Sequence, residues 1–474
     1  MALHTKLEIL SPENLTRVHE ASLEVLKLTG VVFKCPQALE TFRQNGARVE
    51  GETVYLDPKM VEDAIEKAPC TFRWEARNPA NAITLGEGFA VQPNGGVVDV
   101  QDEDRGRRPA LLEDFANIQK LCQASEVVSL VGSFPVEPRD VSAEEKHLQV
   151  TYTILRHTDK PIISYCSYTR QVNQMMDMVE IAMGGGKYLE SHYAVAVSLN
   201  PLSPLKFSTD AAEALMAFAR RRQPVMVLSC VMAGVSGPIH PLGVVVQQNA
   251  EILAGLTLVQ LITPGNPVVY CPASTAANMK IAGYVTGPPE AFLINTTNLQ
   301  LARDLYHLPT RTMCGMTDSK RVDCQAGYET MQNLMMGMLS GAHIIHECLG
   351  VLDSIMCTSY EKFIIDEELI GRVMRISRGL EFTPEVLSLD IIAEVDHGGD
   401  YLLHDSTFAH ARDFWAPTVS VWEPFGTWEK QGREDALTRA GRRYRAILEE
   451  APDSLLDTAL EADLQAYMRQ AAKG

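Results

Sequence analysis

The feature that most limits how this chain folds is a repeated alternation between short apolar runs and longer stretches with helical periodicity. Strands that are apolar along their whole length, with helices between them, are typical of a parallel sheet covered on both faces. Eight such units predict a (β/α)8 TIM barrel, with an open doubly wound sheet as the alternative. The eight apolar runs lie at 95–100, 127–134, 161–166, 193–200, 224–230, 267–273, 310–316 and 342–350.

The segments on either side of these units differ in texture from the units themselves. Ser11 followed by Pro12 and Glu13 is a typical helix start, and short β-like runs begin at Cys70. The end of the chain is mainly helical, with an intervening stretch rich in His, Gly and Asp. We therefore predict N-terminal helices with a short β segment at 1–90, a barrel core at 91–356, and a C-terminal helical extension packed on the barrel at 357–474.

Composition excludes several classes of protein. The 474 residues carry a formal charge of −18, which argues against a nucleic-acid partner and against an anionic membrane surface. The first ten residues lack the features of a signal peptide, and no apolar run approaches the roughly 18 residues of a membrane span. The ten cysteines form no Cys-x-x-Cys pair and are interpreted as reduced thiols. We expect a cytoplasmic protein.

Arginines gather in the last helical segment of the chain. We interpret them as a solvated helix face, and the alternative is a docking patch for an acidic partner protein. The residues are Arg433, Arg439, Arg442, Arg443 and Arg445.

Residues at the ends of the predicted strands are the candidate site residues, because active sites of such barrels lie at the C-terminal ends of the strands. Tyr165 and Asn200 lie at the ends of their apolar runs, and His346 and Glu347 lie in the second half of the run at 342–350. A further cluster of polar residues lies between the run at 310–316 and the next helix. There Asp318 is either a helix cap or a ligand residue, whereas Asp323 is interpreted as the cap.

The sequence HIIHE at 343–347 calls for a decision between helix and strand. On a strand, His343 and Glu347 share one face and His346 takes the other. Three metal ligands are then not on one face, and we do not predict a metal site. His346, near the rim, is instead a candidate substrate contact.

The chain contains no complete match to several well-known catalytic and nucleotide-binding motifs. GGGK at 184–187 lacks both the earlier glycine and the following Ser or Thr of a P-loop, and MAGVSG lacks a glycine of the dinucleotide fingerprint. No Gly-x-Ser-x-Gly elbow occurs. We therefore expect the reactive group to come from outside the chain, and we name no catalytic residue.

Four stretches resemble the trimethylamine methyltransferase (MttB) superfamily, and the resemblance covers nearly the full chain. This resemblance implies transfer of a methyl group from an amine to the cobalt of a separate corrinoid protein, with no cofactor bound by the chain itself. Because the chain contains only the twenty standard residues, it is similar to the branch without pyrrolysine, whose members demethylate glycine betaine, proline betaine and carnitine. The stretches are ILSPENLTRVHEASLEVL (9–26), MCGMTDSKRVDCQAGYET (313–330), GAHIIHECLG (341–350) and SYEKFIIDEELIGRVMR (359–375).

The chemistry of such a reaction fits the lack of motifs. A quaternary nitrogen leaves as a neutral tertiary amine, so no general acid is needed, and Co(I) supplies the nucleophile. The protein then has to orient a zwitterion and exclude water. For the ammonium group the candidates are Tyr165, Asp318 and Glu347. For the carboxylate they are His346, Asn200 and Lys320.

Two alternatives stay open from the sequence. One is a non-catalytic betaine-binding subunit. The other is a metal-dependent barrel enzyme whose ligands would be His343, His346, Glu347, Asp396, His397 and Asp400. In each case we expect a homo-oligomer.

Overall fold

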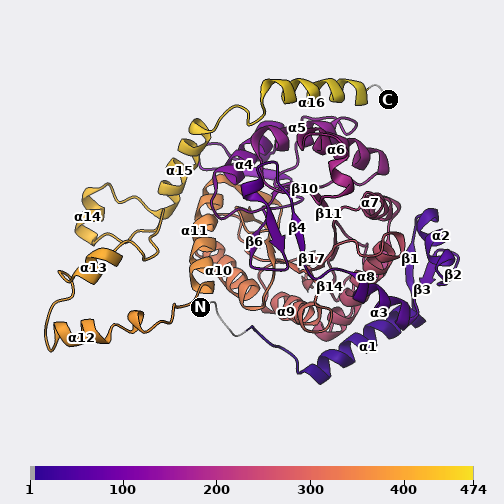
Figure 1. The fold of residues 1–474 in the computed structure, drawn as a ribbon, viewed down its shortest axis with the longest axis horizontal. Helices are drawn as coiled ribbons and strands as arrows, with labels where there is room; N and C mark the ends of the chain where they lie inside the picture. Colours follow the sequence, from indigo (N-terminus) through magenta and orange to yellow (C-terminus); the bar gives the residue numbers. More distant parts are fainter. Residues whose placement is uncertain (1–5, 473–474) are drawn as a thin grey trace.

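The computed structural model describes residues 6–472, and within them parallel strands occupy the centre with helices around them (Figure 1). One sheet has the order β15-β13-β11-β10-β9, and a second has the order β18-β19-β6. The strands are β6 (Ala90–Val91), β9 (Val131–Gly132), β10 (Ile162–Ser164), β11 (Val195–Leu199), β13 (Val225–Ser229), β15 (Val268–Pro272), β18 (Arg311–Met313) and β19 (Ile344–His346).

Backbone contacts join the two parallel sheets at both edges. A parallel bridge pairs Tyr270 with Thr310, between β15 and β18. At the other edge the amides of Ser129 and Leu130 donate to the carbonyl of Val91, at 2.9 and 3.0 Å. The arrangement is a TIM-barrel-like α/β fold.

One of the eight predicted strands is wrong. The run at 95–100 does not lie between β19 and β9; β6 takes that place, and β7 (Asp99–Asp102) belongs to a separate sheet with β8 (Gly106–Pro109), β20 (Val351–Leu352) and β21 (Cys357–Ser359). Pro93 follows β6 and has no N–H to continue a ladder, so the chain leaves the sheet there. Each of the other seven predicted runs contains one strand.

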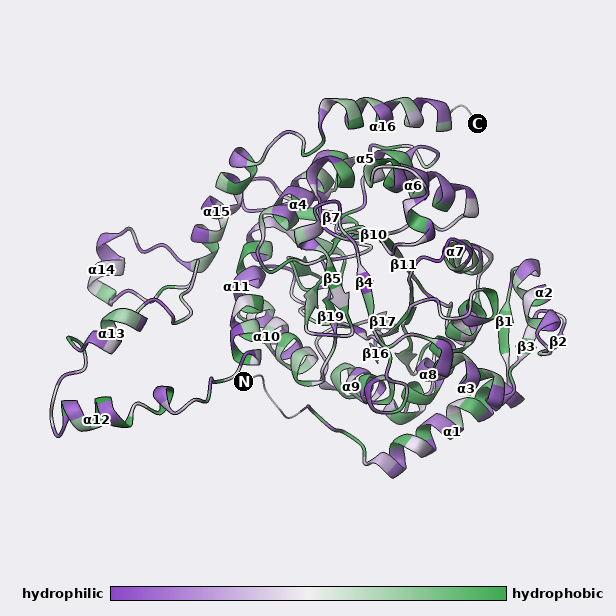
Figure 2. Ribbon diagram, viewed as in Figure 1, coloured by the Kyte–Doolittle hydropathy of each residue, from purple (hydrophilic) through white to green (hydrophobic). Residues whose placement is uncertain are grey.

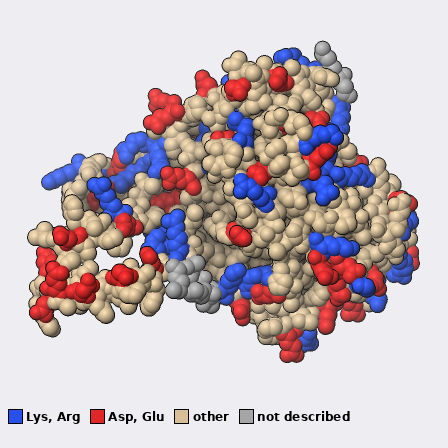
Figure 3. Space-filling model, in the orientation of Figure 1, with Lys and Arg blue, Asp and Glu red and all other residues tan. Residues whose placement is uncertain are grey.

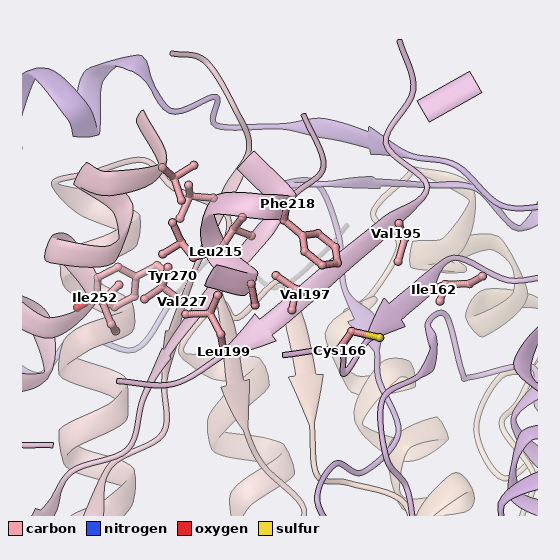
Figure 4. Packing of buried hydrophobic residues seen from close by; sticks show 14 of the residues in the cluster. Ile162, Cys166, Val195, Val197, Leu199, Leu215, Phe218, Val227, Ile252 and Tyr270 are labelled. Carbon is pink, nitrogen blue, oxygen red and sulfur yellow. The ribbon is translucent and has the colours of Figure 1, made fainter. Parts of the chain in front are cut away.

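Helices follow the strands and cover their outer faces (Figure 2). In Figure 4, Leu215 and Phe218 of α7 pack over Val195 and Val197 of β11, and all four are buried. Burying a side chain such as Phe218 contributes about 1.5–3 kcal/mol. The covering helices are α4 (Leu112–Ala124), α5 (Lys146–His157), α6 (Thr169–Ala182), α7 (Thr209–Arg220), α8 (Pro241–Ile262), α9 (Pro289–Asp304), α10 (Cys324–Leu339) and α11 (Tyr360–Ser377).

The helix α8 is the one described helix with the length and composition of a membrane span. In its most apolar window, 83% of the residues are buried inside the protein. It packs between α7 and α9 and against the N-terminal helices, so its apolar surface is used by the core.

Alternate strand residues face the inside of the ring, where a second apolar cluster includes Ile163, Ala196 and Met226. The antiparallel pair β4 (Phe72–Trp74) and β5 (Ile83–Leu85) contributes Phe72 and Trp74 to this cluster. Trp74 is fully buried and pairs with Tyr193, just ahead of β11. The strands β4 and β5 therefore close the interior of the ring at the N-terminal ends of its strands.

The N-terminal segment packs on the outside of the ring. Ser11 caps α1 (Pro12–Leu28), as predicted, by accepting from the amide of Asn14. A small sheet has the order β12-β1-β3-β2. Its strands are β1 (Val31–Phe33), β2 (Arg48–Glu50), β3 (Thr53–Tyr55) and β12 (Lys206–Phe207), and the accompanying helices are α2 (Pro36–Gln44) and α3 (Pro58–Lys67).

Part of the C-terminal segment packs on the body of the protein and part of it projects away. Helix α15 (Ala436–Glu450) packs along α11, and α16 (Thr458–Ala471) packs along α6. Between α11 and α15 the chain projects from the body (Figure 1). The first part of this projection, residues 379–418, is called the arm; it carries α12 (Leu389–Val395) and α13 (Asp405–His410), and α14 (Phe425–Lys430) follows it.

Candidate functional site

A cavity of about 490 Å³ opens at the C-terminal ends of the parallel strands, within the size range of small-molecule sites. Side chains from β10, β11, β13, β18 and β19 reach into it, together with the loops that follow β6 and β9. The polar and aromatic residues of its wall are Ser133, Phe134, Ser164, Tyr165, Ser198, Asn200, Tyr284, Arg311, His346, Glu347 and Ser354.

His346 and Glu347 both line the cavity, and here the prediction from strand alternation is wrong. The strand β19 ends at His346, and Glu347 has a left-handed φ of 56°. That turn brings the side chain of Glu347 to the same side as His346. A non-glycine residue in this conformation costs on the order of 1 kcal/mol or more, and such residues cluster at functional sites.

The His346–Glu347 pair is buried and closely hydrogen-bonded. Nε2 of His346 lies 2.7 Å from Oε1 of Glu347, and Nδ1 lies 2.8 Å from the carbonyl oxygen of Pro93. The amide of Gly95 donates to the same Oε1 at 3.0 Å. Burial lowers the pKa of His346, the Arg311 charge lowers it further, and Glu347 opposes both effects. Oε2 of Glu347 is buried without a hydrogen-bond partner among the described residues.

Arg311 is the charged residue of this cavity that the sequence analysis missed. Its side chain is buried, one guanidinium nitrogen (Nη1) donates to Oγ of Ser198 at 3.0 Å, and its Nε has no partner among the described residues. Burial lowers its pKa from the usual arginine value. A buried cation without an ion pair is costly unless a ligand compensates it. The signal in the sequence was an arginine inside a buried strand, where charge is rare.

Aromatic rings form part of the wall. The rings of Phe134 and Tyr165 lie 4.0 Å apart between centroids, and the Tyr165 hydroxyl donates to the carbonyl of His147 at 2.9 Å. The Tyr284 hydroxyl donates to the carbonyl of Ala273 at 3.1 Å. Because both hydroxyls are engaged with backbone, these tyrosines offer mainly their ring surfaces to a ligand. Asn200 lies at the exposed edge of the cavity.

The structure places Asp318 and Lys320 outside the cavity wall. Oδ1 of Asp318 accepts from the amide of Thr286 at 2.8 Å and from Oγ of Ser354 at 2.6 Å, and Oδ2 accepts from the amide of Gly287 at 3.0 Å. Asp318 thus ties three loops together. Lys320 is exposed and donates to the carbonyl of Asp318 at 2.6 Å. Neither residue is brought to the ligand-sized space.

Asp323 is the N-cap of α10, as predicted, and accepts from the amide of Ala326 at 3.0 Å. The polar residues between β18 and α10 therefore serve largely to hold loops together and to cap the helix.

The residues considered for a metal are widely separated. His343 lies at the opposite end of β19 from the cavity, where its Nδ1 accepts from the amide of Thr310 at 3.1 Å. Asp396, His397 and Asp400 lie on the projecting arm. Within residues 6–472, no group of three His, Cys, Asp or Glu side chains is placed to hold a metal ion.

Exposed apolar side chains lie on loops at the C-terminal ends of the strands, the end at which the cavity opens. They come from loops after β11, β13 and β15 and from the small sheet of β14 (Met232–Ala233), β16 (Thr275–Asn278) and β17 (Gly283–Tyr284). Met279 is 59% exposed and Ile281 is 73% exposed. The others are Leu202, Val235 and Ile239.

A TIM-barrel-like fold with a charged, aromatic cavity at the C-terminal strand ends defines a class of proteins that hold small polar molecules there. The chain belongs to the trimethylamine methyltransferase (MTTB) family, whose model matches residues 2–474. It is 35% identical to a glycine betaine methyltransferase of Desulfitobacterium hafniense (strain Y51), over 99% of this chain and 98% of that relative. It is 32% identical to a proline betaine:corrinoid methyltransferase of Eubacterium limosum, over 85% of each chain.

Similarity in three dimensions extends to a more distant methyltransferase. The crystal structure of the Methanosarcina barkeri monomethylamine methyltransferase (MtmB) matches with a TM-score of 0.56 at 11% identity. The match covers 94% of this chain and 89% of that one. At this identity the match supports the fold alone.

Proposed function

We propose that this protein transfers a methyl group from a betaine-type quaternary amine to the Co(I) of a partner corrinoid protein in the cytoplasm. Family membership and the names of the similar proteins support the reaction class. The observation that carries the substrate class is the presence of two oppositely charged groups, Arg311 and Glu347, in the wall of one cavity. Such a pair suits a zwitterion, whereas trimethylamine offers no carboxylate to an arginine.

The order of these groups along the barrel gives the substrate a direction. Arg311 pairs in register with Ile344, two residues deeper than the pairing of Met313 with His346. A carboxylate held by the guanidinium would therefore lie deep, in charge-assisted hydrogen bonds. The ammonium group would lie nearer the mouth, beside Glu347 and the rings of Tyr165 and Phe134. An N-methyl group then faces the opening.

The residues of this chain orient the substrate and exclude water rather than supply a nucleophile. In the displacement, an electron pair of Co(I) forms the bond to the methyl carbon while the C–N bond electrons stay on nitrogen. The amine leaves neutral, so no proton has to be delivered. We therefore assign His346 to holding Glu347 in place, not to acid catalysis.

The apolar mouth supports a partner that approaches from that side. Leu202, Ile239, Met279 and Ile281 are exposed on loops at the C-terminal ends of the strands, the end at which the cavity opens. Exposed apolar surface of this kind marks interaction sites. We infer that the corrinoid protein docks on this rim. We also infer that the central strands form a (β/α)8 barrel, at residues 91–356, flanked by the parts at 1–90 and 357–474.

The decisive experiment incubates the purified chain with its reduced corrinoid protein and a panel of quaternary amines. We expect conversion of Co(I) to methyl-Co(III), seen in the absorption spectrum, with one or more betaines and not with trimethylamine. Turnover of a betaine without any corrinoid would contradict the proposal, and a stoichiometric metal in an active preparation would favour a metal-dependent enzyme. Tight betaine binding without methyl transfer would favour a binding subunit.

A further inference from the structure

The projecting arm, residues 379–418, is built unlike the rest of the chain. In this stretch, all of which the structure describes, no residue is buried. Large apolar side chains are nevertheless frequent, and the most exposed are Leu403 at 87% and Phe408 at 89%. The other exposed members are Leu380, Phe382, Val386, Leu387, Leu389, Ile392, Tyr401, Leu402 and Phe414.

The rest of the chain does not cover the apolar side chains of this segment. Eleven large side chains at these exposures leave on the order of 1,000 Å² of apolar surface, against ~800 Å² from each partner in a standard protein interface. The largest apolar patch of a monomeric protein is only about 300–600 Å². The arm bows away from the body, and background shows through the loop that it makes (Figure 3). A surface of this size on an open loop calls for a partner.

The position of the arm argues against the methyl acceptor as that partner. The arm begins where α11 ends, and α11 follows the last parallel strand and returns to the N-terminal ends of the strands. A cavity of about 420 Å³ at its base is lined by Val127, just ahead of β9, by Met374 of α11, and by Phe414 and Trp415 of the arm. Its other lining residues are mostly charged, namely Glu126, Glu367, Glu368, Arg375, Arg378, Asp413 and Arg443. The substrate cavity opens at the other end of the strands. A protein docked at the mouth does not cover the arm.

Charge favours a second copy of this chain. The arm contains eight acidic residues, a single arginine, Arg412, and no lysine. Beside its base lies the arginine face of α15 and the turn before it, in which the side chains of Arg433 and Arg442 are 64% and 66% exposed. Each of these arginines pairs with one acid of its own chain and keeps open donors. In a two-fold dimer each acidic arm meets the arginine face of the other copy, so the contact is made twice.

We propose that residues 379–418 form an exchange arm that packs on a second copy of this chain, with Leu402, Leu403 and Phe408 packing against the apolar side chains of the partner's arm. The two arms of a symmetric dimer then bury their apolar sides together. This inference goes beyond the proposed function, since it concerns assembly and holds whatever the cavity binds.

The test compares the mass in solution of the full chain with that of a Leu402→Glu/Leu403→Glu variant at about ten micromolar, by sedimentation. One chain is 52.3 kDa. We expect the unaltered protein at twice that mass and the double variant at the single-chain mass with an unchanged circular dichroism spectrum. The matched control is Leu28→Glu, another exposed leucine, at 63% exposure on α1, which leaves the dimer intact.

A second measurement does not depend on how the variant folds. Hydrogen exchange of the unaltered protein should show slowed amide exchange within 379–418, and dilution to the single-chain mass should remove that protection. An unaltered protein of single-chain mass at micromolar concentration overturns the proposal. So does a double variant that keeps the two-chain mass, or an arm whose amides exchange freely in the dimer.

Discussion

Nε2 of His346 lies 2.7 Å from Oε1 of Glu347, and both side chains are buried. The carbonyl of Pro93 accepts only, so Nδ1 of His346 carries a hydrogen, and the Gly95 amide already donates to Oε1. These two contacts hold Oε1 in place. Oε2 of Glu347 has no hydrogen-bond partner among the described residues and keeps its acceptor capacity for a cation.

Replacing Glu347 by Gln tests the role of that carboxylate. We expect about 10- to 100-fold weaker betaine binding, since hydrogen bonds and contacts to a charged group are worth about 1.5–3 kcal/mol. Titration calorimetry with the best substrate measures the change. Asp304→Asn, an exposed acid at the end of α9, serves as the control with unchanged affinity. Unchanged affinity in Glu347→Gln would remove Glu347 from the ammonium site.

Arg311→Met separates binding from stability. A buried cation without an ion pair is costly, so Met of similar length should leave the free energy of unfolding unchanged or raise it. Betaine affinity should nevertheless fall by about 30-fold or more, because charged partners in buried pairs are worth 2–5 kcal/mol. Binding of tetramethylammonium, which has no carboxylate, should not fall with it. Equal losses for both ligands would show that Arg311 shapes the cavity rather than binding the carboxylate.

The next prediction concerns the exposed apolar residues near the cavity opening, on which we infer that the corrinoid protein docks. Ile281→Glu combined with Met279→Glu should lower the rate with the corrinoid protein at least tenfold by placing charge in an apolar contact. Transfer to free cob(I)alamin, which needs no protein contact, should be unaffected. Rates measured side by side with the two acceptors decide the matter. A parallel fall with both acceptors would point to damage in the cavity, and no fall with either would move the docking surface elsewhere.

The sequence allowed the fold to be predicted further than the site, for a physical reason. Buried parallel strands carry a continuous apolar pattern, so seven of the eight runs each contain one strand of the ring, whereas the eighth strand, β6, lies outside the predicted runs. Side-chain direction at the strand ends depends on single φ values. The left-handed turn at Glu347 reversed the expected alternation. Arg311 was missed because its neighbours in sequence are those of a core strand.

Asp318 shows the converse error, since a polar residue at a strand end need not face the ligand. Its carboxylate accepts from Thr286, Gly287 and Ser354. Asp318→Asn places an amide group against one of these donors, and we expect a loss of about 1–3 kcal/mol in the free energy of unfolding. The betaine affinity per folded molecule should stay within twofold. Urea unfolding and calorimetry on the same preparation test this, and a selective loss of affinity would return Asp318 to the site.

His343 makes the protein acid-sensitive at a place far from the chemistry. Burial, with a smaller effect of Lys6, lowers the pKa of His343 to about 4 from its usual 6.5. Below pH 6.5, His343 binds a proton in the unfolded chain but not in the folded chain. The free energy of unfolding therefore falls as the pH drops from 6.5 toward 4. Protonation would also oppose the hydrogen bond that Nδ1 accepts from the amide of Thr310.

His343→Asn keeps an acceptor for that amide but removes the titration. We expect the variant to lose less stability than the unaltered protein between pH 7 and pH 5, by about 1–2 kcal/mol, which follows from the 1.36 kcal/mol of each pKa unit. The measurement is the free energy of urea unfolding at both pH values. His397→Asn, which changes a fully exposed histidine on the arm, is the control and should leave the pH dependence as it was. If both variants show the slope of the unaltered protein, His343 does not remain neutral in the folded state.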